Sequence, residues 1–107
     1  MIFKLLFAHA LADFSLQTEI MAKLKNRKNK QDFIPDGQKY VTCWHYWMGS
    51  HALIHGGMVW LITGKVYLGI IETIAHFIID FLKCENITNP NQDQLMHFIC
   101  KIIYCFI

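Results

Sequence analysis

The sequence predicts an all-α fold, in which a compact bundle of about four apolar helices encloses an interior lined by His and Asp side chains. The first observation is composition, because hydrophobic residues make up 54% of the 107 residues and charged residues only 17%. Average soluble domains carry roughly 25% charged residues. The second observation is that four long apolar segments are separated by polar stretches. The third is that each apolar segment carries one pair of His or Asp residues four positions apart.

The four predicted helices fit one helical domain that spans residues 1–107. Their approximate bounds are residues 2–23, 42–62, 66–83 and 91–107. The first segment lacks Gly and Pro and is rich in Leu, Ala and Phe, which favours one continuous helix. Glycines in the second segment permit close packing against a neighbouring helix. The polar sequence ENITNPN interrupts the chain before the last helix, where Asn91 or Asp93 is the expected cap.

A hydrophilic segment, the basic loop, spans about residues 24–41 between the first two helices. Its charged residues are Lys25, Arg27, Lys28, Lys30 and Lys39, against Asp32 and Asp36. One interpretation is a solvated loop. The other is a cytoplasmic loop beside anionic lipid, because short loops rich in Lys and Arg mark the cytoplasmic side of a membrane. Nucleic acid is not an expected partner, since the net charge is only +2 and the basic part holds no interleaved aromatic residues.

The apolar character of the chain also predicts association with a membrane, although no segment is a clean spanning helix. Such a helix needs about 20 mostly apolar residues, and every segment carries charged residues or histidines. Trp44, Tyr46 and Trp47 cluster at one end of the second segment, as aromatic residues do at a membrane interface. We therefore expect a protein of the inner (cytoplasmic) membrane, with membrane lipid as a partner and with the basic loop and the site facing the cytoplasm. The alternative is a soluble bundle whose oily surface serves assembly, for example as a homo-oligomer.

The polar residues inside the apolar segments share one spacing. The pairs are His9–Asp13, His51–His55, His76–Asp80 and Asp93–His97. Residues four apart lie on one helix face, so each predicted helix presents one such pair to the interior. If the helices run antiparallel, a rise of about 1.5 Å per residue brings all four pairs to a similar depth, on the side of the basic loop.

These eight residues predict a metal centre, because imidazole and carboxylate are the usual ligands of zinc, manganese and iron. Helical bundles build such sites between facing helices. We expect one or two divalent ions, zinc or manganese, with the eight side chains as ligands or immediate partners. Asp13 and Asp80 are the candidate catalytic residues, one of which would act as general base on a metal-bound water. The candidates for orienting ligands or binding substrate are Gln17, Lys23, Glu72, Lys83 and Gln94.

Two other interpretations of the four pairs stay open. They can form a purely hydrogen-bonded network that fixes the bundle, or a path for protons or metal ions. Burying an isolated carboxylate is costly, so buried charges are normally paired with one another or bound to a metal. All three interpretations place the pairs in the interior.

Four stretches of the sequence carry a resemblance to a known family. They are HALADFSLQTEIMAKLK at residues 9–25, the His51–His55 pair, HFIIDFLK at residues 76–83 and DQLMH at residues 93–97. In this order they resemble domain-of-unknown-function family 3307. The resemblance implies a small, mostly helical, membrane-associated protein of bacteria or their phages, and it supports the site residues more than any reaction. The pattern is also distantly similar to predicted membrane-bound metal-dependent hydrolases, which place His and Asp on apolar helices.

The first functional hypothesis is therefore a membrane-associated metal-dependent hydrolase of the phosphoesterase type, acting on a phosphate-containing substrate. The alternative is a non-enzymatic binding protein, for example a phage-encoded inhibitor or sequestering protein with a host protein as partner. In that case the His–Asp network is structural. Stoichiometric metal separates the two hypotheses.

Overall fold

The structure is a computed structural model that describes residues 1–29, 37 and 43–107. Its elements are α1 (Ile2–Ala10), the π-helical turn η1 (Leu11–Ser15), α2 (Glu19–Leu24), α3 (Trp44–Thr63), α4 (Val66–Cys84) and α5 (Pro90–Phe106). No strand occurs among the described residues, and the predicted all-α class is confirmed. Much of the predicted basic loop, including Lys30, Asp32, Asp36 and Lys39, lies outside the described residues.

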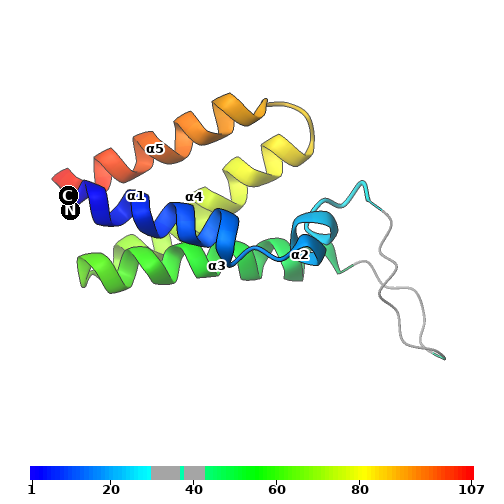
Figure 1. Ribbon diagram of the computed structural model, residues 1–107, viewed down its shortest axis with the longest axis horizontal. Helices are drawn as coiled ribbons and strands as arrows, with labels where there is room; N and C mark the ends of the chain where they lie inside the picture. The colour runs from blue at the N-terminus through cyan, green and yellow to red at the C-terminus, as the bar shows by residue number, and fades with distance from the viewer. Residues whose placement is uncertain (30–36, 38–42) are drawn as a thin grey trace.

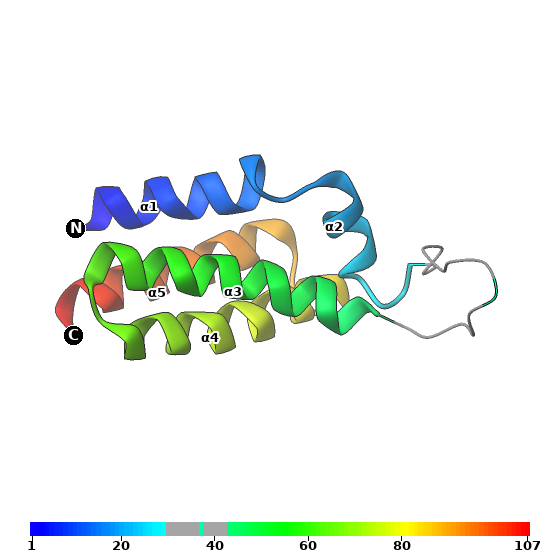
Figure 2. The same cartoon turned by 90° about the horizontal axis from the view of Figure 1, so that it is seen from below.

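The four longer helices form an up-and-down bundle. Successive helices run in opposite directions, and α1 and α4 each contact both α3 and α5 (Figure 1). The two chain termini lie at the same end of the bundle, and α2 packs beside the beginning of α3 at the other end (Figure 2). The interior of this arrangement is therefore shared by α1, α3, α4 and α5.

The prediction of one continuous helix over residues 2–23 is wrong. The α-helical geometry ends at Ala10, a π-helical turn follows, and a new helix begins at Glu19. Thr18 caps the start of the new helix: its backbone is extended, and its hydroxyl accepts a hydrogen bond from the Met21 amide at 3.1 Å. Threonine is favoured at this position because its oxygen satisfies one of the otherwise unpaired amides of the first turn.

The start of the last helix also differs from the prediction. Neither Asn91 nor Asp93 caps it, because the helix begins one residue earlier, at Pro90, and the cap is Asn89. Asn89 and Gln92 exchange side-chain to backbone hydrogen bonds of 2.8 and 3.0 Å, which is a capping box. Proline suits the first helical position because its missing N–H would have no partner there. Asp93 is thereby left to point into the bundle, where it is buried.

The bundle carries its polar residues inside and many of its apolar residues outside. The buried apolar residues include Leu5, Met48, Val59, Leu68, Ile79 and Tyr104, of which Leu5, Val59, Leu68 and Tyr104 form one cluster. The buried charged and polar residues are Lys25, His51, His55, Glu72, His76, Asp80, Asp93, His97 and Lys101. Large hydrophobic side chains are exposed on each of the four longer helices. Within the described residues, no helix combines the length and the apolar character that crossing a membrane requires.

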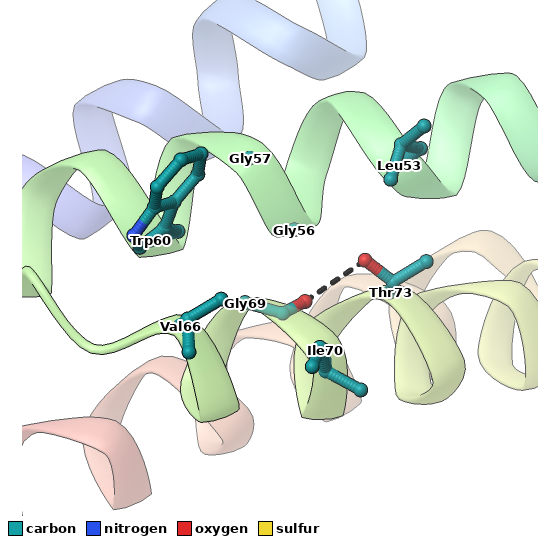
Figure 3. Close-up of a pocket in the computed structure, with 8 residues that line it drawn as sticks. All are labelled: Leu53, Gly56, Gly57, Trp60, Val66, Gly69, Ile70 and Thr73. Atoms are coloured by element: carbon teal, nitrogen blue, oxygen red, sulfur yellow. Dashed lines mark hydrogen bonds between the residues drawn. The ribbon is translucent and has the colours of Figure 1, made fainter.

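Helices α3 and α4 approach each other closely at Gly56 and Gly69 (Figure 3). A Cβ atom on Gly69 would lie 2.8 Å from the Gly56 carbonyl oxygen and 2.9 Å from Trp60 Cβ. A Cβ atom on Gly56 would lie 2.5 Å from the Gly69 carbonyl oxygen and would overlap the Thr73 hydroxyl. That hydroxyl donates a 2.8 Å hydrogen bond to the same Gly69 oxygen. Glycine is therefore required at both positions for this helix spacing.

We expect Gly56→Ala to lower the free energy of unfolding by about 1–3 kcal/mol, because the added methyl group meets backbone that cannot move without separating the helices. The neighbouring Gly57→Ala is the matched control. No atom lies within 4 Å of its added Cβ, so it should stabilise the helix by about 0.4–1 kcal/mol. Denaturant unfolding measures both changes. Equal unfolding midpoints for the two variants would contradict the close approach.

Candidate metal centre

The structure brings the four predicted His and Asp pairs together inside the bundle. His9 and Asp13 come from α1 and η1, and the other three pairs come from α3, α4 and α5. Among them, His51, His55, His76, Asp80, Asp93 and His97 are each exposed by 2% or less. The side chains of His9 and Asp13 are exposed by 10% and 11%. The predicted convergence of the eight residues is therefore observed, whereas their roles stay predictions.

Asp13 is the carboxylate around which the imidazoles gather. Its Oδ1 lies 3.0 Å from His55 Nε2 and 3.2 Å from His51 Nε2. Its Oδ2 lies 3.4 Å from His9 Nε2 and accepts a 3.1 Å hydrogen bond from Gln94. Asp13 sits in the π-helical turn, a rare geometry that is frequent at functional sites.

The imidazole rings of the site are packed against one another. The His55 and His76 rings stack with centroids 3.6 Å apart, and those of His76 and His97 with centroids 4.2 Å apart. Burial is the largest cause that lowers the pKa of His55, to about 4, and that of His76, to about 3. Contacts with Asp13 and Glu72 oppose this effect only in part. The two rings are therefore neutral at pH 7, which is the form that binds a metal ion.

Several buried nitrogens of these rings have no hydrogen-bond partner in the described part of the chain. They are His9 Nδ1, both ring nitrogens of His51 and of His76, and His97 Nδ1. Buried polar atoms are almost always satisfied by protein, water or an ion. One ligand atom from each of Asp13, His51, His55 and His76 can be chosen so that all four lie within 4.8 Å of one another. This geometry is what a single ion needs.

A second group of potential ligands consists of Glu72, His76 and His97. Glu72 is already engaged, because Lys101 donates to its Oε1 and Tyr104 donates to its Oε2 at 2.7 Å. Its Oε1 also lies 3.5 Å from His76 Nδ1. Burial raises the pKa of the Glu72 carboxyl, but the contacts with His76 and Lys101 outweigh burial and hold it well below its ordinary range. Glu72 is thus placed to orient the His76 ring, as carboxylates behind metal-binding histidines do.

The buried carboxylates differ in whether a lysine accompanies them. Asp80 accepts a 2.6 Å hydrogen bond from Lys25, and Lys83 lies 3.2 Å from Asp80 and 3.4 Å from Asp93. Glu72 is paired with Lys101. Asp13 has no Lys or Arg nitrogen within 4 Å among residues 1–29, 37 and 43–107, so only imidazoles and an amide surround it.

The five predicted supporting residues have different places. Gln17 donates a 3.1 Å hydrogen bond to the Asp13 backbone oxygen, and Gln94 contacts both Asp13 and Asp93. Lys83 is a quarter to a third exposed and bridges two carboxylates, as described above. Lys23 is exposed on α2, and its role stays a prediction. The lysine from this region that reaches the interior is Lys25.

Sequence reasoning missed three interior residues, Lys25, Lys101 and Tyr104. Lys101 had a signal, because it lies four residues after His97 and so continues the Asp93–His97 face of α5. Tyr104 follows on the same face three residues later. Lys25 had none, because it belongs to a run of basic residues and its partner Asp80 is 55 residues away.

The chain belongs to the family described as "Protein of unknown function (DUF3307)", whose model matches residues 1–107. The resemblance to this family is thereby confirmed. No curated protein and no solved structure matches the chain. The similarity to membrane-bound hydrolases stays a prediction, and the chemistry of the site has to be argued from its own geometry.

The pKa values of the histidines predict how the stability of the metal-free protein depends on pH. His55 and His76 have an ordinary pKa of 6.5 when unfolded and values of about 4 and 3 when folded. Below about pH 6.5 the unfolded chain therefore binds more protons than the folded chain. The contribution of the two neutral histidines to stability is complete above this pH and is lost as the pH falls. Each histidine should cost up to about 1.4 kcal/mol per pH unit in this window.

Denaturant unfolding in the presence of a chelator, at several pH values between 7.5 and 5, measures this slope. The control variant is His45→Asn, because His45 is exposed and lies outside the cluster, and it should leave the slope unchanged. His55→Asn should reduce the dependence of the unfolding free energy on pH. An unfolding free energy that stays constant from pH 7 to pH 5 would contradict the neutral, buried state of the two rings.

Proposed function

We propose that the chain binds one divalent transition-metal ion, zinc or manganese, through Asp13, His51, His55 and His76, and that it hydrolyses a phosphate-containing substrate there. The observation that carries the proposal is the environment of Asp13. This largely buried carboxylate has no Lys or Arg side chain beside it in the described residues. Imidazole nitrogens of His9, His51 and His55 lie within 3.4 Å of it instead, and His51 Nε2 has no hydrogen-bond partner there. A cation between these groups would satisfy both the charge and the nitrogens.

The donor set fits zinc and manganese. Three imidazoles and one carboxylate are ligands that both ions accept. Four protein donors would fill a tetrahedral zinc site, so a coordinated water needs a fifth position, which zinc can open and manganese, with its higher coordination number, provides. One ion is favoured over two, because Glu72 in the second group is already bound by Lys101 and Tyr104. The lysine of that pair would also repel a second cation at this place.

The remaining residues have assignable tasks. A bound divalent ion acts as a Lewis acid and lowers the pKa of a coordinated water. Asp80 lies next to the proposed ligands, with its Oδ2 3.8 Å from His51 Nε2 and its Oδ1 3.2 Å from the Lys83 amine. Burial by itself would raise the pKa of the Asp80 carboxyl, but the opposite effect of Lys25 and Lys83 is larger, and the pKa lies below its ordinary value. The carboxylate therefore stays ionised and can accept a proton. Lys83, which is partly exposed and pairs with Asp80, would contact a phosphate oxygen.

The proposal also places the protein at a membrane. Exposed apolar side chains on each of the four longer helices support placing the bundle against membrane lipid. The basic loop and the site would then face the cytoplasm. A second copy of the chain or a host protein would cover part of the same surface. If no metal binds, the alternative of a binding protein with a structural His–Asp network takes the place of the hydrolase.

The metal proposal predicts about one zinc or manganese ion per chain after addition to the chelator-treated protein and removal of excess. Asp13→Asn should lose the ion while remaining folded, because the amide keeps the shape of the side chain and removes its charge. His45→Asn is the control and should keep the ion. Elemental mass spectrometry and circular dichroism on all three proteins check this. Folded wild-type protein without stoichiometric metal would overturn the proposal.

The hydrolase proposal predicts a separate result for Asp80→Asn. This variant should keep the ion and lose phosphoesterase activity toward p-nitrophenyl phosphate by about 100-fold or more, the usual contribution of a general base. Wild-type activity should disappear with chelator and return with metal. A metal-loaded Asp80→Asn protein as active as the wild type would exclude Asp80 as the base, and loaded wild-type protein inactive toward phosphate esters would contradict the reaction class.

A further inference from the structure

We propose that the groove between α1 and α5 holds the apolar chain of an amphipathic anion, whose charged end reaches the metal centre. The α1–α5 groove is lined by Leu6, His9, Gln94, Leu95, Phe98 and Lys101. The proposal rests on the metal centre described above and specifies the class of its substrate. Helices α1 and α5 lie next to each other in the bundle (Figure 1), and both contribute residues to the groove.

The size and the walls of the groove suit an alkyl chain. Its volume is roughly 430 Å³, within the range of about 300–1,000 Å³ that small-molecule sites occupy. Leu6, Leu95 and Phe98 form apolar walls. Leu95 and Phe98 are 59% and 42% exposed, so a ligand can cover them without any rearrangement of the bundle.

The inner end of the groove leads to the metal centre. Gln94 donates a hydrogen bond to Asp13 Oδ2 at 3.1 Å, and its Oε1 lies 3.2 Å from His9 Nε2. His9 and Asp13 are also the most exposed of the eight clustered residues. The cluster therefore meets the surface on the side of this groove.

Charge determines which end of the ligand points inward. Four carboxylates, those of Asp13, Glu72, Asp80 and Asp93, share the interior with the buried or half-buried amines of Lys25, Lys83 and Lys101. By formal charge, these four carboxylates and three amines leave one negative charge, and a bound divalent ion would turn it into one net positive charge. An anionic head group would neutralise it, while the attached chain lies along the apolar walls.

The experiment compares decyl phosphate with inorganic phosphate on zinc-loaded protein, below the micelle concentration, by isothermal titration calorimetry. Each methylene group that is buried strengthens binding about fourfold, so the decyl chain should improve the affinity at least about tenfold. Leu95→Asp should abolish this gain, because it places a negative charge in the wall, and it should leave the zinc content unchanged. Ile103→Asp, at an exposed position of α5 outside the groove, is the matched control and should keep the gain.

The groove proposal would be overturned if the decyl chain brings no gain in affinity, or if Leu95→Asp and Ile103→Asp lose the same amount of that gain. Binding of uncharged decanol to the metal-free protein separates this failure from failure of the metal centre. Decanol binding that Leu95→Asp removes and Ile103→Asp keeps supports the groove even if no metal binds. Decanol binding that is absent or insensitive to Leu95→Asp overturns the groove even if the metal centre is real.

The source of the amphiphile is tested with vesicles of phosphatidylcholine, with and without phosphatidic acid. Co-sedimentation that needs phosphatidic acid and Leu95 supports the groove and identifies a bilayer lipid as the source. Binding of decyl phosphate without such co-sedimentation supports the groove with a free amphiphile as its ligand.

Discussion

Charge compensation inside a narrow bundle is the constraint on which the rest of this structure depends. Ionisable side chains occupy the interior positions that a typical bundle fills with Leu and Ile, and taking each charge out of water costs several kcal/mol unless a partner is in place. The partners come from different helices. Lys25 beyond α2 meets Asp80 of α4, and Lys101 of α5 meets Glu72 of α4. These contacts fix the register of the helices, because a shift of one residue would leave buried charges unpaired.

Helix α4 is the centre of this network. Its residues Glu72, His76, Asp80 and Lys83 lie on one face and contact side chains from the other helices. The same helix packs closely on α3 through Gly69. A shift of α4 along its axis would therefore move Glu72, which orients His76, and would separate Asp80 from Lys25. The small apolar cluster at the terminal end of the bundle supplies less of this specificity, since apolar contacts tolerate small shifts that ion pairs do not.

The fold class, three of the long helices and the convergence of the four pairs could be predicted from sequence, because spacing by four reports directly which residues share a helix face. The break between Ala10 and Glu19 could not, since hydropathy and the absence of Gly and Pro favoured a continuous helix, and a π-helical turn has no simple sequence signal. The lysine partners were also missed. A pattern along one helix cannot show that Lys25 crosses to Asp80, and a basic run is normally solvated, so the buried member of the run was hidden among exposed ones.

The distribution of apolar residues gives the polar interior its functional meaning. A bundle stabilised in water by its own core places apolar side chains inside. This chain buries apolar residues such as Leu5, Met48 and Leu68, but it also buries ionisable residues and exposes large hydrophobic ones along each long helix. Where exposed apolar residues of this kind join into a patch, they mark contact with a membrane, a ligand or another protein. A ligand that approaches from an apolar environment would meet the interior charges where His9 and Asp13 are partly exposed. Once the interior holds a divalent ion, an anionic group would gain there, because little water screens the interaction between the helices. The apolar exterior and the charged interior thus favour the same molecule, one that is apolar along its length and anionic at one end.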